Sequence, residues 1–326
     1  MGILGTKWAV AVMGCLAVLG ASPAVAQWPS GQVKIVVPYP PGTEPDVMAR
    51  DIGMRLTQQT GSVVVVENRP GANGMIGTAS VAKSAPDGHT LLMIDRLALV
   101  TNPMLYGELP YDPKVDIRPV AEVGRINLFV AVRQDFPGST YKDLMTYARS
   151  STGKLNVGTG GNGHVNHLGM EMLAQSEGVV FSYVPYKGVA PAMNALLAGD
   201  VDTVMAGGLV MSQQAQAGKI RVMVVGDDVR SAFMPTVPTL AEAGGKAGSI
   251  PSTIFMLAAQ GKTPTALVDQ VNAAVNNVLA DPELRASYSK RGVDLLNSSR
   301  EAAQDGFKRE VVTYDALIKQ AHIKIQ

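Results

Sequence analysis

Short apolar segments alternate with helical patterns along most of the chain, and this alternation limits the folds that the sequence can adopt. Residues 33–37 form a β-branched run, and a helical pattern follows that ends at Gly61. Residues 63–66 and 91–94 repeat the apolar run, with a helical pattern at about 75–83 between them. Strands that are apolar throughout and separated by helices are typical of a parallel sheet covered on both faces. The sequence therefore predicts an α/β fold.

The same alternation returns in the second half of the chain. Further strands are predicted at 128–132, 154–158, 179–184, 201–205 and 220–225. The C-terminal part is predicted to be helical, with Ser298 or Ser299 as the cap of the last helix. A chain of 326 residues is long enough to build two hydrophobic cores. The pattern indicates a second α/β sheet that is inserted into the first.

Residues 1–26 have the pattern of an export signal. Lys7 precedes an uncharged run at 8–20 that is too short to cross a bilayer core of about 30 Å, and Ala24-Val25-Ala26 forms a small-residue cleavage site. We expect cleavage after Ala26. A short membrane anchor and lipoprotein processing at Cys15 are the alternatives, and the apolar residues that continue beyond Cys15 argue against the second.

The composition excludes several classes of function. The chain has 28 Lys and Arg against 27 Asp and Glu, and 5% of its residues are aromatic, so it lacks the basic field and the stacking surface that nucleic-acid binding requires. The only cysteine, Cys15, lies in the predicted signal, which excludes thiolate metal sites and cysteine nucleophiles from the mature chain. No G-x-S-x-G motif marks a catalytic serine. The mature chain is expected to be soluble and to need no cofactor.

The loop after the first strand is a candidate ligand-binding segment, because ligands of open α/β sheets bind beside the carboxyl ends of strands. Tyr39, Pro41, Gly42 and Thr43 lie there, directly before a predicted helix whose free N–H groups favour an anion. Asp46 is predicted to cap this helix while the amides of Gly42 and Thr43 face the ligand. A purely structural capping box is the alternative, and the two interpretations can hold together.

A second candidate loop has the sequence TGGNGHVNH at residues 159–167 and joins a strand to a helix. Its glycines and the helix end predict an anion-binding nest. The spacing also fits the dinucleotide pattern G-x-G-x-x-G, but no acidic residue ends the next strand, so a nicotinamide or flavin role is weak. His164 and His167 lie one helical turn apart without a third ligand nearby, and no metal site is predicted.

Arg96 follows the third strand and has two interpretations of equal weight. Its guanidinium can offer a bidentate contact to a carboxylate of the ligand. It can equally form an ion pair with Asp95 or with another local acid.

Several stretches together resemble one family, the Bug (TctC-like) extracytoplasmic solute-binding proteins of tripartite tricarboxylate transporters. The motifs occur in the order expected for this family and cover nearly the whole mature chain. They are IVVPYPPG at 35–42, VENRPGANG at 66–74, APDGHTLLM at 85–93, LPYD at 109–112, VPYKG at 184–188, AQAGKIR at 215–221, VPT at 237–239 and DPE at 281–283.

The resemblance implies a two-domain, periplasmic-binding-protein-like fold of type II, with a cleft between the domains. Domain 1 comprises residues 27–127 and 253–326, and domain 2 comprises residues 128–252. Two strands cross between the domains, near 127–132 and 253–258. Such proteins capture a small carboxylate in the periplasm by domain closure and deliver it to the integral membrane subunits of the transporter. We expect a monomer that is not an enzyme and does not bind nucleic acid.

In the family, one carboxylate is held between the first loop and the glycine-rich loop. The candidate ligand-binding residues are Tyr39, Pro41, Gly42, Thr43, Arg96, Thr159, Gly160, Gly161, Asn162, Gly163, His164, Asn166, Tyr186 and Gly207. The sequence departs from the family at Thr43, where a second glycine is usual, at Glu44, at Arg96 and at residues 206–208. Arg96 therefore suggests a ligand with a second acid group, an aliphatic or aromatic dicarboxylate. An exported enzyme or a sensor domain that uses the same cleft is the alternative.

Overall fold

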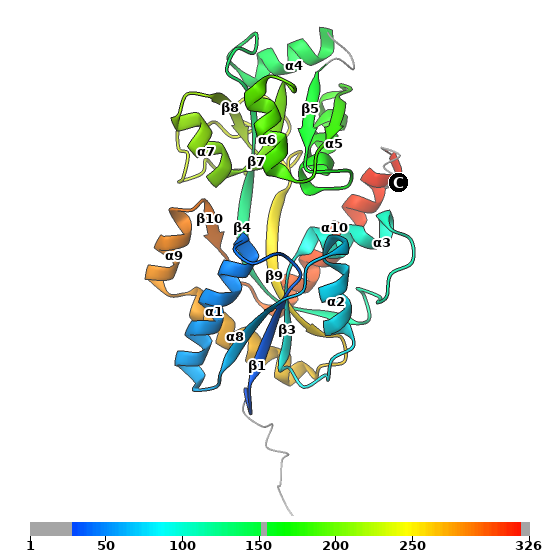
Figure 1. The fold of residues 1–326 in the computed structure, drawn as a ribbon, viewed down its shortest axis with the longest axis vertical. Helices are drawn as coiled ribbons and strands as arrows, with labels where there is room; N and C mark the ends of the chain where they lie inside the picture. Colours follow the sequence, from blue (N-terminus) through cyan, green and yellow to red (C-terminus); the bar gives the residue numbers. More distant parts are fainter. Residues whose placement is uncertain (1–27, 151–154, 321–326) are drawn as a thin grey trace, which may run out of the picture.

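The computed structural model describes residues 28–150 and 155–320 and shows two lobes joined by two long strands (Figure 1). The predicted signal and its cleavage site lie outside the described residues. The first lobe contains β1 Val33–Val37, α1 Glu44–Thr60, β2 Val64–Asn68, η1 Ala72–Gly74, α2 Met75–Ala82, β3 Thr90–Asp95, α3 Arg96–Leu105, α8 Thr265–Leu279, α9 Pro282–Ser289, β10 Val293–Leu295 and α10 Arg300–Gln320. The strands predicted for this part of the chain are therefore present, within a few residues of the predicted bounds.

The second lobe is formed by the central part of the chain. It contains α4 Tyr141–Ser150, β5 Asn156–Thr159, α5 Val165–Glu177, β6 Ser182–Pro185, α6 Val189–Ala198, β7 Thr203–Gly207, α7 Gly208–Gln216 and β8 Ile220–Val225. Within each lobe one strand pairs in parallel with two others: β1 with β2 and β3, and β5 with β6 and β7. This arrangement confirms the α/β prediction for both halves.

Two strands, β4 Ile117–Arg133 and β9 Ser252–Gln260, run between the lobes (Figure 1). β4 pairs with β9 up to Asn127 and with β7 from Leu128 onwards, so it changes sheets between these two residues. Both strands pair antiparallel with their neighbours. The sheets are therefore mixed and not purely parallel, because β9 runs antiparallel to β3, and β4 runs antiparallel to β7 and β8.

Each lobe has its own buried core on both faces of its sheet. In the first lobe α1 and α8 cover one face through residues such as Ile52 and Val271, and α10 covers the other through Phe307 and Leu317. α10 begins where Ser299 Oγ accepts the N–H of Ala302 at 3.1 Å, so Ser299 is the cap. This packing fixes the carboxyl ends of β1 and β3 toward the second lobe.

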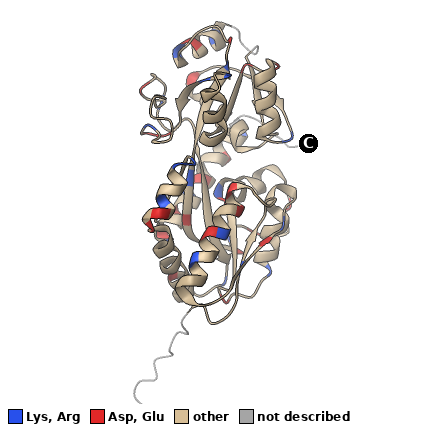
Figure 2. Ribbon diagram, turned by 60° about the vertical axis from the view of Figure 1, so that its left-hand side comes forward, with Lys and Arg blue, Asp and Glu red and all other residues tan. Residues whose placement is uncertain are grey.

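Charged side chains are distributed over the outer helices. Figure 2 shows Lys and Arg interleaved with Asp and Glu, without a continuous block of either sign, in keeping with the formal net charge of +1. Within residues 28–150 and 155–320, no helix combines the length and apolar character needed to cross a membrane.

Candidate functional site

A cavity of about 280 Å³ lies at the junction of the two lobes, where β4 and β9 cross. Its walls come from the segments that join β1 to α1 and β5 to α5, from the ends of β3 and β7, from the start of α6, and from the crossing strands. The residues that line it are Tyr39, Thr43, Pro45, Asp95, Ile126, Leu128, His164, Val165, Asn166, Val189, Met205, Ala206, Gly207, Thr253 and Phe255. The cavity thus lies beside the carboxyl ends of strands, as ligands of open α/β sheets do.

Five helices begin at this cavity. Thr43, Asp95, His164 and Gly207 are the N-cap residues of α1, α3, α5 and α7, and Val189 is the first residue of α6. The first N–H groups of a helix have no partner within it, and the helix dipole adds a partial positive charge. Among the described residues that line the cavity, none is Lys or Arg. The positive potential that an anion would meet here therefore comes from backbone amides.

The loop between β1 and α1 contributes Tyr39 and Thr43 to the cavity, whereas Pro41 and Gly42 do not line it. The N–H of Gly42 donates to Asp46 Oδ2 at 2.8 Å, so this amide is bound within the loop. The prediction that it faces a ligand is wrong, because the carboxylate of Asp46 occupies it. Gly42 has φ +81°, which a residue with a side chain rarely adopts, and this turn places Thr43 at the helix start.

Asp46 holds the loop together from inside the helix. Besides Gly42, it accepts hydrogen bonds from Arg50 Nη2 at 2.9 Å and from Asn68 Nδ2 at 2.8 Å. Burial alone would raise the pKa of Asp46, but the hydrogen bonds from Arg50, Gly42 and Asn68 outweigh it and hold the pKa below its usual value. The N-cap position itself is taken by Thr43. Asp46, at the third position of the helix, therefore anchors the preceding loop through Gly42 and accepts none of the helix N–H groups.

The loop between β5 and α5 contributes His164, Val165 and Asn166 to the cavity. Asn166 Oδ1 accepts the N–H of Gly160 at 3.0 Å, and Asn166 Nδ2 donates to the carbonyl of Met205 at 3.2 Å. His167 Nδ1 accepts the N–H of Gly163 at 3.0 Å. The amides of Gly160 and Gly163 are therefore bound within the loop, and the prediction that the Gly160 amide reaches a ligand is wrong.

The remaining members of this loop shape it without lining the cavity. Thr159 is buried and its hydroxyl has no hydrogen-bond partner among the described residues. Gly161 has φ +123°, and a Cβ there would come within 3.5 Å of the carbonyl oxygen of Tyr186. Asn162 and Tyr186 are also absent from the described cavity wall. Gly207 does line it, and its contact with a ligand stays a prediction.

Both histidines of the loop are neutral near pH 7. Burial lowers the pKa of His164, and burial followed by repulsion from His164 lowers the pKa of His167 to about 4. His167 also packs edge-on against Tyr183, with ring centroids 4.7 Å apart. Over the described residues, no group of three His, Cys, Asp or Glu side chains is arranged to hold a metal ion.

Arg96 does not lie at the cavity. It is the first residue of α3, and its guanidinium binds Glu122 of β4 and Glu310 of α10. It is not among the lining residues, and it forms ion pairs as the second interpretation held, although with acids distant in the sequence and not with Asp95 or a local acid. Glu44 is likewise engaged, by Arg291 at 3.0 Å, and does not line the cavity. Neither departure from the family motif places a charged side chain on the cavity wall.

Two features of the wall were not predicted. The apolar surface of Ile126, Leu128, Met205 and Phe255 comes from the crossing strands, whose apolar pattern is also that of a core. Asp95 lines the cavity, although the sequence presented it only as a partner for Arg96. Its position directly after a predicted strand was the available signal.

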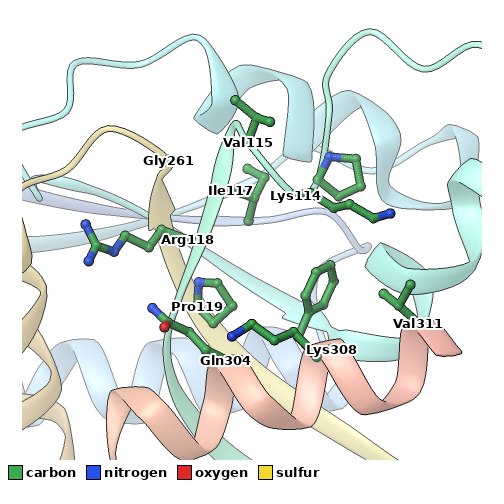
Figure 3. A pocket seen from close by; sticks show the side chains of 11 residues that line it. Lys114, Val115, Ile117, Arg118, Pro119, Gly261, Gln304, Lys308 and Val311 are labelled. Carbon is green, nitrogen blue, oxygen red and sulfur yellow. The ribbon is translucent and has the colours of Figure 1, made fainter.

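Four larger cavities, of about 540, 530, 410 and 300 Å³, lie elsewhere on the described part of the molecule. Figure 3 shows the first, between the start of β4, with Ile117 and Arg118, and α10, with Gln304 and Lys308. None of the four is lined by the carboxyl ends of the parallel strands β1, β3, β5 or β7. The cavity at the lobe junction is therefore the candidate site.

Comparisons with known proteins agree with this architecture. The family model described as "Tripartite tricarboxylate transporter family receptor" (TctC) matches residues 48–323. A UPF0065 protein of Pseudomonas sp. strain P51 is 33% identical over 291 residues, which are 89% of this chain and 86% of that protein.

Two solved structures of Rhodopseudomonas palustris proteins share the fold and carry named ligands. One, with adipate, has a TM-score of 0.79 and 30% identity, and the match covers 91% of this chain and 100% of that one. The other, MatC with bound malate, has a TM-score of 0.74 and 28% identity, and the match covers 89% and 99%. With a family model that spans most of its length, this chain belongs to the TctC family of tripartite tricarboxylate transporter receptors, which are periplasmic solute-binding proteins.

Proposed function

We propose that the chain captures a small carboxylate in the cavity between its lobes and delivers it to the integral membrane subunits of a tripartite tricarboxylate-type transporter. The observation that carries this proposal is the convergence of five helix N-termini on one cavity that the described residues line without a Lys or Arg; those of α1, α6 and α7 have no side-chain cap. Each helix end stabilises an anion by about 0.3–1 kcal/mol when exposed and up to about 2 kcal/mol when partly buried. Together they favour a carboxylate over a neutral ligand.

The size and polarity of the cavity narrow the ligand class. A volume of about 280 Å³ suits a compact molecule, and the apolar wall of Ile126, Leu128 and Phe255 suits a short carbon skeleton. Adipate and malate, the ligands of the two solved relatives, are acids of this kind. Because Arg96 does not line the cavity, a second acid group on the ligand is no longer required. The proposed ligand is therefore a mono- or dicarboxylate of a few carbons.

The division of the chain supports capture between moving parts. We assign residues 27–127 with 253–326 to one domain and residues 128–252 to the other, because β4 changes its partners between Asn127 and Leu128. Each domain contributes helix starts to the cavity, so closure brings both sets of amides onto one ligand. The protein is proposed to act in the periplasm as a monomer, after cleavage behind Ala26.

Thermal melting of the mature chain with a panel of acids tests the proposal. The panel holds C4–C6 dicarboxylates, benzoates, phthalates and amino acids, and each acid is compared with the amide of the same skeleton as a control. A ligand at 100 times its dissociation constant adds about 2.7 kcal/mol and raises the midpoint by several degrees. A shift with an acid and none with its amide supports the proposal, and a flat panel contradicts it. Chromatography of the incubated acid reveals turnover, the outcome expected of an exported enzyme.

A further inference from the structure

Asp95 is an acidic side chain in a cavity whose wall is otherwise apolar or uncharged and at which five helices begin. It ends β3, lies in register with Phe255 of β9, and lines the cavity together with Tyr39 and Thr253. Its backbone N–H donates to Tyr39 Oη at 3.2 Å, which fixes the end of the strand beside the first loop. Among the described lining residues it is the only Asp or Glu.

The two carboxylate oxygens of Asp95 have different surroundings. Oδ1 accepts the N–H of Leu97 at 2.9 Å and so caps α3. Oδ2 has no hydrogen bond or ion pair with any residue in the described part of the chain. Arg96, the adjacent cation, is bound to Glu122 and Glu310 and does not neutralise it. One oxygen of Asp95 is therefore left as an acceptor for whatever fills the cavity.

A ligand that consists only of carboxylates and methylenes cannot use this acceptor. Its first carboxylate is matched by the helix ends, but a second one placed near Asp95 meets a like charge. A hydroxyl or ammonium group at the same place donates to Oδ2 and removes the mismatch. A site built to bind such a donor discriminates strongly against an analogue that lacks it, because the buried acceptor is then left unpaired.

We infer that Asp95 is a specificity-determining residue that selects carboxylates bearing an O–H or N–H donor, that is, hydroxy or amino acids, over the unsubstituted parent acids. The inference deepens the proposed function and rests on it.

The ionisation of Asp95 adds a pH dependence to this selection. Burial raises its pKa to about 7; the hydrogen bond from Leu97 lowers it, repulsion from Glu310 raises it and attraction to Arg96 lowers it. Above pH 7 the carboxylate accepts, and below pH 7 the acid can itself donate to a second carboxylate. The titratable and charged groups around Asp95 are Tyr39 from the first loop, Arg96 from α3, Glu310 and Tyr314 from α10, Glu122 of β4 through Arg96, and neutral His164 across the cavity.

Calorimetric titration with matched acids tests the inference. The probes are succinate, malate and aspartate, with the corresponding C5 and C6 sets, at pH 8.0 and pH 5.5. At pH 8.0 we expect a hydroxy or amino acid to bind at least tenfold more tightly than its parent. In Asp95→Asn, which places an N–H where Oδ2 stands, the ratio should fall below about threefold. In the unsubstituted protein at pH 5.5 the parent acid should gain affinity. A comparison of the affinities for malate and aspartate shows whether the site prefers a hydroxyl or an ammonium donor.

The variant is suited to this comparison because Asn caps helices as well as Asp does, so α3 should be retained. Asp281→Asn is the matched control: Asp281 caps α9 by accepting the N–H groups of Glu283 and Leu284, and it does not line the cavity. An unchanged ratio in Asp95→Asn, or a preference of the unsubstituted protein for the parent acids, overturns the inference and leaves the proposed function standing. If none of the panel carboxylates binds, the proposed function itself fails.

Discussion

Asn166 joins the two ends of the glycine-rich loop: its Oδ1 accepts the N–H of Gly160 at 3.0 Å, while its Nδ2 donates to the carbonyl of Met205 at 3.2 Å. One buried amide side chain thus connects the end of β5, the start of α5 and strand β7. The position of the helix ends around the cavity depends on such contacts, because no lining Lys or Arg among the described residues can compensate for a displaced amide.

Asn166→Ala should therefore impair both stability and binding. It leaves a buried donor and a buried acceptor unpaired, which costs about 1–3 kcal/mol, and it should weaken carboxylate binding at least tenfold. Asn272→Ala is the control, because Asn272 bridges the carbonyls of Val120 and Ser298 in the first lobe, away from the cavity. Denaturant unfolding and calorimetry measure the two effects. Equal affinity losses in both variants would contradict the role of Asn166.

Asp46 should have a corresponding role on the opposite side of the cavity. Asp46→Ala releases the Gly42 amide and frees Arg50 and Asn68, so the loop that carries Thr43 should lose its position and affinity should fall at least fivefold. Asp143→Ala removes similar contacts, with the amides of Ser139 and Thr140 at the start of α4, outside the cavity. It should lower the melting temperature without changing affinity. Unaltered binding by Asp46→Ala would refute this interpretation of the first loop.

Arg96 should stabilise the fold and contribute little to ligand selection. Arg96→Met leaves Glu122 and Glu310 without their cation in a largely buried position, which should cost about 3 kcal/mol. Adding Glu310→Gln to this variant should restore part of the loss. The affinity ratio between a dicarboxylate and its monocarboxylate should change less than about threefold. A selective loss of dicarboxylate binding in Arg96→Met would show that Arg96 does contribute to ligand binding.

His167 should make the second lobe sensitive to acid. Its pKa is about 4 in the folded protein and 6.5 in the unfolded chain, so the unfolded chain binds the proton first and stability falls as pH drops from 6.5 to 4. The contribution is roughly 3 kcal/mol at most. Asp95 has the opposite effect, because its raised pKa stabilises the folded state at low pH. The contribution of His167 is therefore measured as the difference in the free energy of unfolding between a His167 variant and the unsubstituted protein.

His167→Gln should therefore gain up to about 3 kcal/mol relative to the unsubstituted protein between pH 6.5 and pH 4. His89→Gln, at a histidine that contacts Asp87 and Ser30 far from the cavity, serves as the control. Unfolding curves across this pH range measure the difference. A His167→Gln difference that does not vary with pH would show that this histidine is not the acid-sensitive group.

The sequence predicts which segments form strands and helices better than it predicts which side chains contact one another. Alternating apolar runs locate β1, β3 and β5, and Gly42 and Gly161 mark two turns with positive φ. Local pattern cannot reveal that Arg96 meets Glu310, because 214 positions separate them. Nor can it show that Asn166 and Asp46 bind the loop amides that seemed free for a ligand.

The position of Asp95 at the cavity could not be predicted from the sequence either. An Asp before a helix is sufficiently explained as a cap, and Asp95 is one. Only the placement of β3 beside β9 reveals that Asp95 also lines the cavity shared with Thr253 and Phe255. The apolar wall was missed for a related reason, since Leu128 and Ile126 follow the pattern of a core strand.

The proposed binding of a carboxylate by helix N-termini at the lobe junction can be measured by calorimetry of the acid that gives the largest melting shift, compared with the carboxamide of the same skeleton. We expect the carboxylate to bind at least thirtyfold more tightly than the amide, and Asn166→Ala to remove most of this difference. Equal affinities for the carboxylate and the amide would contradict this proposal.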